Sequence, residues 1–593
     1  MRWFPRLLLA LLSAAAWIGG GGTGCAKRPE PGTIVLLNGD IYTGESGFSE
    51  ARAMVITGRT ITAVCKTDDW AKRYIGKETR VIDLEGKFVL PGLIDAHVHF
   101  SAAGALINDA NLLAVSDEKS LRREIERVTA RLKEGEWITE GRWGAYEEWA
   151  QGSAGDAPKS AAVPWRPNRG MIDDLTPHHP CFLCRFDEKI WLANGTALQA
   201  AGLDKKRLSG LELGPDGKST GIVIKPSPAF DALHKALRPK SRERLLDENR
   251  AALKVLRESG LTEIHDVSSP EQIDRFVELE SAGELTCRVW LRPDLSLGAE
   301  LKTAGLTMGL HPKTKQKSYW LRYGALKGTI DGILGTHGAL LFEPYRDQPG
   351  NTGTWSSHAS SDPDLKTGDL DKLYGLIQTG LGAGFVPNIH ASGDRAVAET
   401  LDLFERIQKE RQQPLKGFRI IHAQVVRPED FKRFRRLGVI AEVNPFHLAE
   451  DMRWMEERIG RDRARYAFAF KSLLDNGAML VFGSDWPGTG AALYQVHPKY
   501  LIYTAVTRKT PDGKPQGGWF PEERISVKEA IKAYTINAAI AAFEDDKRGS
   551  LEANKFADLT IFDRNLLKIK PAEILKAEVT HTIVDGRIVF EKR

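Results

Sequence analysis

The sequence predicts an α/β protein built around a closed (β/α)8 TIM barrel. Short apolar, strand-like runs recur along the middle of the chain, and amphipathic stretches of helical periodicity separate them. Alternating strands and helices in this number are typical of the barrel, and a doubly wound open sheet is the structural alternative. The expected barrel strands are residues 93–99, 261–267, 287–291, 323–330, 385–389, 418–421, 439–443 and 479–483.

The two ends of the chain resemble each other and predict a second, smaller domain. Apolar runs joined by Asn38-Gly39 near one end and by Asp585-Gly586 near the other are typical of β-hairpins. We therefore expect residues 32–92 and 546–593 to pair into one composite β-sandwich, with the barrel, residues 93–545, inserted between them. The stretch from about 103 to 255 is too long for one crossover and predicts an inserted subdomain after the first barrel strand.

The composition argues against nucleic acid as a partner. The 593 residues are 42% hydrophobic, and 83 basic and 78 acidic side chains give a net charge of +5. This charge is nearly balanced for the length, and no basic run suits nucleic acid. The expected partner is a small-molecule substrate, and the sequence is also compatible with a homodimer.

The first 25 residues have the pattern of a targeting segment. Arg2 and Arg6 precede an apolar run, residues 7–18, that is short for a membrane span, and small residues then lead to Cys25. This pattern predicts export to a bacterial periplasm or cell envelope, with Cys25 lipidated and anchored to the membrane as in a lipoprotein. Simple secretion or a short retained anchor is the alternative, because Gly22 stands where a lipoprotein signal usually has an aliphatic residue.

Two histidines one residue apart end the first predicted barrel strand. Residues i and i+2 of a strand point to the same face, so His97 and His99 can aim two imidazoles at one point. Taken alone, the pair fits an ordinary buried strand better than a metal site. In a TIM barrel, however, catalytic groups collect at the carboxyl ends of the strands. Later predicted strands end in or carry further candidates there: Lys327, His390, His422 and Asp485.

These residue types suit a divalent metal. Four histidines and a carboxylate favour zinc or a similar ion. Lys327 is the unusual member, because an ammonium group is a poor metal partner and costly to bury unpaired. If burial favours the neutral amine, the amine can react with carbon dioxide to form a carbamate that bridges two metal ions. A salt-bridged lysine near a strand end is the alternative.

Six stretches carry these residues in order: PGLIDAHVHF, LTEIHDV, LKGTIDG, IHASGDRAV, IIHAQVV and VFGSDWP. Together they resemble the amidohydrolase superfamily, specifically amidohydrolase family 3, of the N-substituted formamide deformylase type. The resemblance implies a TIM barrel with a composite β-sandwich and a centre of two divalent metal ions. It implies that His97, His99 and Asp485 hold the first ion, that His390 and His422 hold the second, and that carboxylated Lys327 bridges them.

Three positions depart from the pattern of that family. Lys189 stands where His is common, Ile421 replaces a Glu often found before the strand-six histidine, and Asn444 stands where Gln is frequent. All three are expected near the pocket and not among the metal ligands. They therefore bear on the substrate more than on the class of reaction.

Other polar residues near the strand ends are candidates for substrate contact or for orienting a ligand. His265 and Asp266 end the second strand, and Asp331 follows Lys327. Asp394 as a helix N-cap is an alternative to substrate contact. Further candidates of this kind are Arg395 after His390, His447 after the seventh strand, and Lys189.

The expected function is hydrolysis of a C–N bond in a non-peptide amide, of the N-acyl or N-formyl type, by a metal-activated hydroxide. Asp485 would accept the proton of the attacking water and deliver it to the leaving nitrogen. One alternative is deamination, ester or lactone hydrolysis, or isomerisation at the same centre. The other is a non-catalytic exported binding protein that retained the barrel.

Overall fold

The computed structural model describes residues 30–44, 51–113, 115–139, 141–144, 165–185, 188–489 and 492–593. The predicted targeting segment, residues 1–25 with Cys25, lies outside the described residues. In the part of the chain that is described, no helix combines the length and the apolarity needed to cross a membrane.

Eight parallel strands form the barrel, as predicted. One half is a sheet in the order β14-β13-β12-β7 and the other a sheet in the order β15-β16-β17-β18-β19. With the fourth strand in two pieces, β14 and β15, the elements are β7 (Leu93–Val98), β12 (Leu261–Asp266), β13 (Arg288–Leu291), β14 (Leu321–Tyr323), β15 (Leu326–Thr329), β16 (Pro387–Ala391), β17 (Arg419–His422), β18 (Ile440–Val443) and β19 (Met479–Phe482).

The fourth strand is broken in two, which the sequence did not predict. Its first half, β14, pairs with β13, and its second half, β15, pairs with β16. A Cβ at Gly324, between the halves, would lie 2.1 Å from the ring of Trp290, so only glycine fits there. The amides of Gly324 and Lys327 donate to the carbonyls of Leu291 and Pro293, which keeps both halves beside β13.

The barrel closes where β19 meets β7, which excludes the open-sheet alternative. The amide of Asp485 donates to the carbonyl of His97 at 2.8 Å, and the amide of His99 donates to the carbonyl of Trp486 at 2.8 Å. Val98 and Trp486 form a parallel bridge at the same seam. Asp485 and Trp486, which follow β19, thus bond to the backbone of the His-x-His segment. The seam itself therefore positions candidate ligands.

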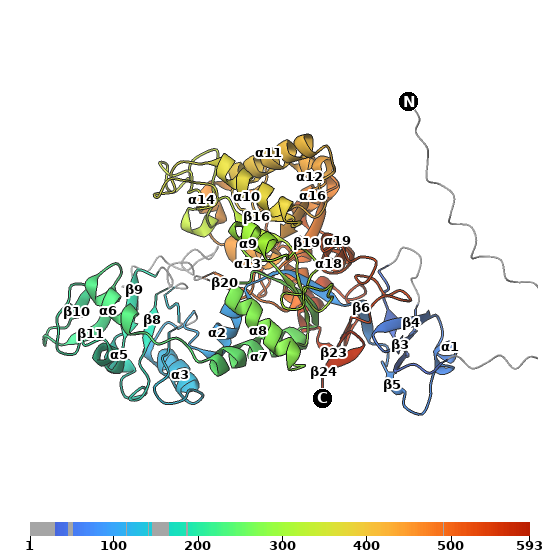
Figure 1. Ribbon diagram of the computed structural model, residues 1–593, viewed down its shortest axis with the longest axis horizontal. Helices are drawn as coiled ribbons and strands as arrows, with labels where there is room; N and C mark the ends of the chain where they lie inside the picture. The colour runs from blue at the N-terminus through green and yellow to red at the C-terminus, as the bar shows by residue number, and fades with distance from the viewer. Residues whose placement is uncertain are drawn as a thin grey trace, which may run out of the picture.

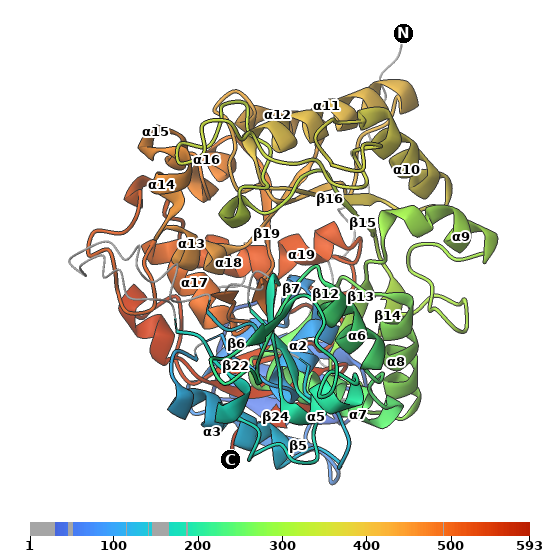
Figure 2. The same ribbon diagram turned by 90° about the vertical axis from the view of Figure 1, so that its left-hand side faces the viewer.

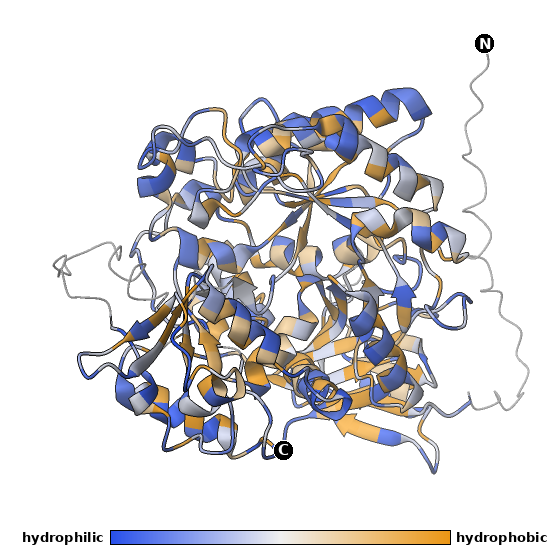
Figure 3. Cartoon of the chain, turned by 60° about the vertical axis from the view of Figure 1, so that its left-hand side comes forward, coloured by the Kyte–Doolittle hydropathy of each residue, from blue (hydrophilic) through white to orange (hydrophobic). Residues whose placement is uncertain are grey.

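Amphipathic helices cover the outside of the barrel (Figure 2). Serine N-caps begin several of them, as at Ser241, Ser269 and Ser526, where the side chain accepts from an amide three residues on. Figure 3 shows apolar residues concentrated in the strands and polar residues on the outer helices. The outer helices are α7 (Arg242–Glu258), α8 (Pro270–Ser281), α9 (Gly298–Thr303), α10 (Leu370–Gly382), α11 (Asp394–Arg411), α12 (Phe431–Leu437), α16 (Phe470–Asp475), α18 (Val527–Tyr534) and α19 (Ile536–Ala541).

Shorter elements follow the strands at their carboxyl ends. They are α2 (Phe100–Asn108) after β7, α13 (Pro445–Asp451) after β18, then α14 (Met455–Ile459) and α15 (Arg461–Ala464). The segment after β19 forms the hairpin β20 (Gly488–Thr489) and β21 (Ala492–Leu493), followed by α17 (Pro498–Thr507).

Strands from both chain ends form a sandwich, as predicted. One sheet has the order β4-β3-β1-β5 and the other β2-β6-β22-β23-β24, so β22 from the C-terminal end pairs antiparallel with β6. Apolar side chains of the two sheets share one buried cluster. Figure 1 shows the two ends side by side in blue and red. The elements are β1 (Ile34–Leu37), β2 (Asp40–Ile41), β3 (Ala53–Thr57), β4 (Thr60–Cys65), α1 (Asp68–Lys72), β5 (Arg80–Asp83), β6 (Phe88–Pro91), β22 (Leu559–Phe562), β23 (Val579–Val584) and β24 (Arg587–Glu591).

The predicted insertion forms a subdomain on the far side of the barrel from β3–β5 (Figure 1). Its sheet has the order β10-β11-β9-β8, and two apolar clusters pack against that sheet. Its elements are α3 (Glu118–Thr129), β8 (Phe182–Cys184), β9 (Ile190–Ala193), α5 (Gly195–Ala200), β10 (Leu211–Leu213), β11 (Ser219–Ile224) and α6 (Pro228–Ala236).

The interior of the barrel contains buried charges in addition to the usual branched aliphatic residues. Four arginines on or directly after its strands are 0% exposed, and two glutamates beside them are at most 1% exposed. Each glutamate contacts two arginines and one histidine. The arginines are Arg288, Arg292, Arg322 and Arg419, and the glutamates are Glu263 and Glu442. Glu442 contacts Arg292 and Arg419, whereas Glu263 contacts Arg322 and Arg548.

Gly483 tests how closely β19 approaches β7. A Cβ added there would lie 2.4 Å from Cβ of His97. We expect Gly483→Ala to lower the free energy of unfolding by about 1–3 kcal/mol, the usual cost of overpacking. Gly375 in α10 is the matched control, because nothing lies within 4 Å of an added Cβ, and Gly375→Ala should stabilise by at most about 1 kcal/mol. Urea unfolding of the metal-free protein measures both, and a Gly483→Ala variant as stable as the parent would contradict this prediction.

Candidate metal centre

The barrel seam brings His97, His99 and Asp485 together. The Nε2 atoms of His97 and His99 lie 3.3 and 3.1 Å from Oδ1 of Asp485. One ligand atom from each of the three residues lies within 4.8 Å of the others. The imidazole of His97 is buried, whereas the side chain of His99 is 41% exposed, so the group can be reached from solvent.

Three further imidazoles lie beside this group. His390 is the penultimate residue of β16 and His422 the last residue of the neighbouring β17, and their ring centroids are 4.5 Å apart. The ring of His422 is 5.5 Å from that of His97. His447, on α13, places Nε2 3.3 Å from Oδ2 of Asp485, and it forms a second group of close ligand atoms with His422 and Asp485. His447 therefore lies in the cluster, stacked at 4.0 Å on Tyr494.

The cluster has the unpaired atoms that a metal ion would satisfy. Nε2 of His97, Nε2 of His447 and Oδ1 of Asp485 are buried without a hydrogen-bond partner. Leaving a buried polar atom unpaired costs about 1–3 kcal/mol, and three in one place call for a common partner. Imidazole nitrogens and carboxylate oxygens are the donors that zinc and similar divalent ions prefer. The residues present therefore fit a divalent metal.

Two residues of the cluster hold strained backbone conformations. His422 has a φ of 72° and Asp485 a φ of 57°, in the left-handed region that favours glycine. Each follows the regular part of its strand, where the chain turns over the barrel rim. Strain of this kind persists where the surrounding structure holds it, commonly at functional sites.

Lys327 lies in the middle of β15, buried, and within electrostatic range of the cluster. Burial first, and then the charge of Arg292, lowers the pKa of Lys327 to about 7. The charge of Lys327 in turn contributes to lowering the pKa values of His97, His390 and His422, after burial as the main cause. The imidazoles are therefore neutral near pH 7, which leaves lone pairs for a metal, and a fraction of the lysine is a neutral amine.

Asp331 supports His390 and the loops beside it. Its carboxylate accepts hydrogen bonds from the amides of Leu340, Ser392 and Gly393, and Oδ1 lies 3.4 Å from Nε2 of His390. Burial raises the pKa of Asp331 to about 7. The side chain thus ties the loop after β15 to the loop after β16, in the supporting role that the sequence allowed.

Asp394 and Arg395 hold the loop that follows β15. Gly393 is the N-cap of α11 and Asp394 is its first residue, so the helix-cap interpretation of Asp394 is wrong. The carboxylate of Asp394 instead accepts from the amides of Phe342 and Arg395. The guanidinium of Arg395 lies 5.2 Å from the ring centroid of Trp355. Both residues therefore bind the insertion between β15 and α10.

The two candidates at the end of β12 point in different directions. Asp266 accepts hydrogen bonds from the amide of Phe100 and the hydroxyl of Ser268, so it braces the turn after His99. His265 is fully buried between Oε1 of Glu263, at 3.2 Å, and a guanidinium nitrogen of Arg419, at 3.1 Å. Its ring lies 4.5 Å from that of Trp290, inside the barrel. His265 therefore does not line a substrate pocket.

Lys189 belongs to a different part of the molecule. It is exposed, directly precedes β9 of the inserted subdomain, and its carbonyl accepts from the amide of Lys225. The structure does not bring it into the histidine cluster. Its role in substrate selection stays a prediction.

Sequence reasoning missed the charged residues beneath the cluster. Glu442 on β18 accepts at 2.8 Å from Nδ1 of His97, and both of its oxygens bond to Arg292. Arg419 donates to the second oxygen at 3.0 Å. Burial opposes its ionisation, yet Arg292 and His97 hold the pKa of Glu442 well below its usual range. An isolated charged residue inside a short apolar strand was the signal that could have found it.

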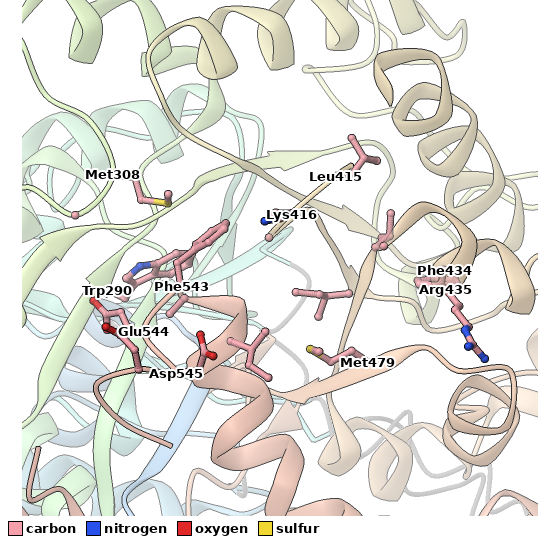
Figure 4. A pocket seen from close by; sticks show the side chains of 18 of the residues that line it. Trp290, Met308, Leu415, Lys416, Phe434, Arg435, Met479, Phe543, Glu544 and Asp545 are labelled. Carbon is pink, nitrogen blue, oxygen red and sulfur yellow. The ribbon is translucent and has the colours of Figure 1, made fainter. Parts of the chain in front are cut away.

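A cavity of about 880 Å³ lies at the opposite end of the barrel (Figure 4). Residues that precede β17, β18 and β19 line it, with Trp290 and Phe543, and its lining includes none of the candidate ligands. TIM-barrel enzymes act at the carboxyl ends of the strands. The histidine cluster, and not this cavity, is therefore the candidate active site.

A TIM barrel with His-x-His on its first strand, a buried lysine, two further strand-end histidines and a strand-eight aspartate defines the class of metal-dependent hydrolases. The family model of the amidohydrolase family matches residues 80–590. The chain belongs to the amidohydrolase family.

Similar proteins cover nearly the whole chain. The protein LONG AFTER FAR-RED 3 of Arabidopsis thaliana is 32% identical, over 94% of this chain and 91% of that protein. The N-substituted formamide deformylase of Arthrobacter pascens is 26% identical, over 94% of this chain and 98% of that enzyme. The crystal structure of an uncharacterized metal-dependent hydrolase from Pyrococcus furiosus superposes with a TM-score of 0.68 at 25% identity, over 90% of this chain and all of that one.

Asp451, on the same helix as His447, makes stability depend on pH. Burial first, and then the charge of Glu450, raises the pKa of Asp451 well above its usual range, against one hydrogen bond from Gln424. A pKa raised in the folded state means that stability is lost as pH rises from about 4 through the folded pKa, by about 1.4 kcal/mol per pH unit. We expect Asp451→Asn to remove this loss, so that its stability relative to the parent grows between pH 4 and pH 8 in urea unfolding. The exposed Asp371→Asn is the control, and parallel curves for Asp451→Asn and the parent would contradict the prediction.

Proposed function

We propose that this protein hydrolyses a C–N bond in a non-peptide amide, of the N-acyl or N-formyl type, with two divalent metal ions, zinc by the choice of donors. One observation carries the proposal: ligand atoms of His97, His99, His422, His447 and Asp485 form two close groups that share Asp485 and contain buried atoms without partners. The buried Lys327 lies within electrostatic range of them. The deformylase named among the similar proteins supports a C–N bond as the target.

The ligand set divides into two halves. His97, His99 and Asp485 would hold one ion, and His390 and His422 would hold the other, with Lys327 between them. Bound ions of this kind lower the pKa of water and polarise a carbonyl oxygen. The neutral imidazoles offer their lone pairs to the ions, and the neutral amine of the buried lysine can be converted to its carbamate.

We infer that Asp485 moves the proton. Its Oδ1 faces His97 and His99, and its Oδ2 faces His447. One carboxylate oxygen can therefore serve the ion while the other takes a proton from the attacking water and returns it to the leaving nitrogen. His99 and His447 border this carboxylate, so the substrate would approach from their side.

Asp485→Asn tests the proton transfer. The amide keeps an oxygen toward His97 and His99 but cannot accept the proton. We expect metal content close to that of the parent by elemental analysis and hydrolysis slower by a factor of about 100 or more. The assay compares N-formyl, N-acyl and cyclic amides with esters and aminated heterocycles. Hydrolysis of esters or aminated heterocycles, but of none of the amides, would favour ester cleavage or deamination. Parent-like turnover by Asp485→Asn would contradict the role of Asp485.

Lys327 is tested by direct detection of the carbamate. The neutral amine and carbon dioxide join with loss of one proton, giving an anionic group in place of a buried cation. We expect a carbamate signal in the carbon-13 spectrum of protein loaded with zinc in labelled bicarbonate, and no such signal in Lys327→Met. An unmodified Lys327 in the metal-loaded protein would favour the salt-bridged alternative.

Export to the periplasm or cell envelope, with lipid on Cys25, is part of the same proposal and rests on residues 1–25 alone. A homodimer stays a prediction. The non-catalytic alternative predicts that the purified protein binds no metal after reconstitution, which elemental analysis of the parent decides.

A further inference from the structure

Strand β18 and the residue that follows it, Asn444, carry none of the proposed metal ligands, yet they contact two of them. Glu442 accepts from Nδ1 of His97 at 2.8 Å, and Oδ1 of Asn444 lies 2.7 Å from Nδ1 of His422. The two side chains are two positions apart, so they point to the same face, the interior of the barrel. His97 belongs to one half of the proposed centre and His422 to the other.

Both contacts determine which ring nitrogen carries the proton. An ionised carboxylate can only accept, so Nδ1 of His97 must donate to Glu442. Asn444 is oriented by a second bond, because its Nδ2 donates to the carbonyl of Gly483 at 2.9 Å, which leaves Oδ1 for His422. Each imidazole then keeps a lone pair on Nε2, and Nε2 of His97 is one of the buried atoms without a partner.

The two acceptors are held rigidly. The guanidinium of Arg292 bonds to both oxygens of Glu442, and Arg419 bonds to the second. Asn444 bridges β17 to the end of β19. Both residues are at most 1% exposed, so water does not compete for these bonds.

A second buried glutamate offers a matched comparison. Glu263 on β12 is 1% exposed and contacts Arg322, Arg548 and His265. It therefore has the same surroundings as Glu442, two guanidinium groups and one imidazole. The difference is that its imidazole partner, His265, is not a proposed ligand.

We propose that Glu442 and Asn444 are positioning residues that present Nε2 of one histidine in each half of the centre, so that β18 sets the affinities of the two metal sites separately. The proposal rests on the two-metal function and deepens it. Outer contacts of this kind typically contribute a factor of 10–100 to metal affinity.

The test measures metal binding, not turnover. Glu442→Leu and Asn444→Leu remove the acceptors, whereas Glu442→Gln and Asn444→Asp keep one. Zinc affinity and stoichiometry are measured on metal-free protein by competition with a chromophoric chelator, and cobalt absorption reports the geometry of each site. We expect each leucine variant to bind one of the two ions 10–100-fold more weakly, a different ion in each case, and each conservative variant to recover most of the loss.

Glu263→Leu separates positioning from stability. It should lose stability in urea unfolding about as Glu442→Leu does, but bind both ions as the parent does. Equal loss of metal affinity in Glu263→Leu and Glu442→Leu would overturn the proposal, as would parent-like affinity in both leucine variants of β18. A parent protein that binds no metal would instead overturn the proposed function itself.

Nitrogen-15 spectra of histidine give a second measurement that needs no metal and no foldable leucine variant. In the metal-free parent, His97 and His422 should carry the proton on Nδ1, and His422 should keep that preference in Asn444→Asp. A proton on Nε2 of His97 and His422 in the parent would overturn the proposal.

Discussion

The hydrogen bond between Glu442 and Nδ1 of His97 is the contact on which the candidate centre depends. It directs the other ring nitrogen toward Asp485, and it can do so only while Glu442 stays ionised inside the barrel. Arg292 and Arg419 supply the charge that keeps it so. The arginines are therefore part of the site although they lie a layer below it. A buried charge without such partners would be lost to protonation or would destabilise the fold.

The barrel interior contains ion pairs where aliphatic side chains usually pack. Glu263 repeats the arrangement of Glu442 one layer away, with Arg322, Arg548 and His265. Arg288 reaches from β13 to Asp558, which precedes β22, and to Asp585, in the turn between β23 and β24, and so joins the two domains. Buried ion pairs add little net stability over apolar packing, but losing one partner is costly. A shift in the register of the barrel strands would separate these paired charges. The buried ion pairs therefore favour the observed register over the adjacent ones.

Above the strands, polar contacts organise the loops that would meet a substrate. Asp331 gathers the amides of two successive loops behind His390, and Asp394 with Arg395 holds the insertion that follows β15. His99, which is partly exposed, contacts the carboxylate of Asp485 from the accessible side, and the buried His447 contacts its other oxygen. All of these groups lie at the carboxyl ends of the barrel strands, where TIM-barrel enzymes act. The loops, which differ more freely than strands, are where selection among amides would occur.

The barrel, the sandwich from both chain ends and the residues at the strand ends could be predicted from the amino-acid sequence, because they follow from local periodicity and order along the chain. His97 and His99 share a face on any strand, whatever surrounds it. The folded structure was needed to show that His265 points into a charged interior and that Asp394 braces a loop and does not cap α11. It was also needed to show that Glu442 and Asn444 hold one histidine each. These outcomes depend on contacts such as that of Glu442 with His97, whose residues lie hundreds of positions apart and meet only when β19 closes onto β7.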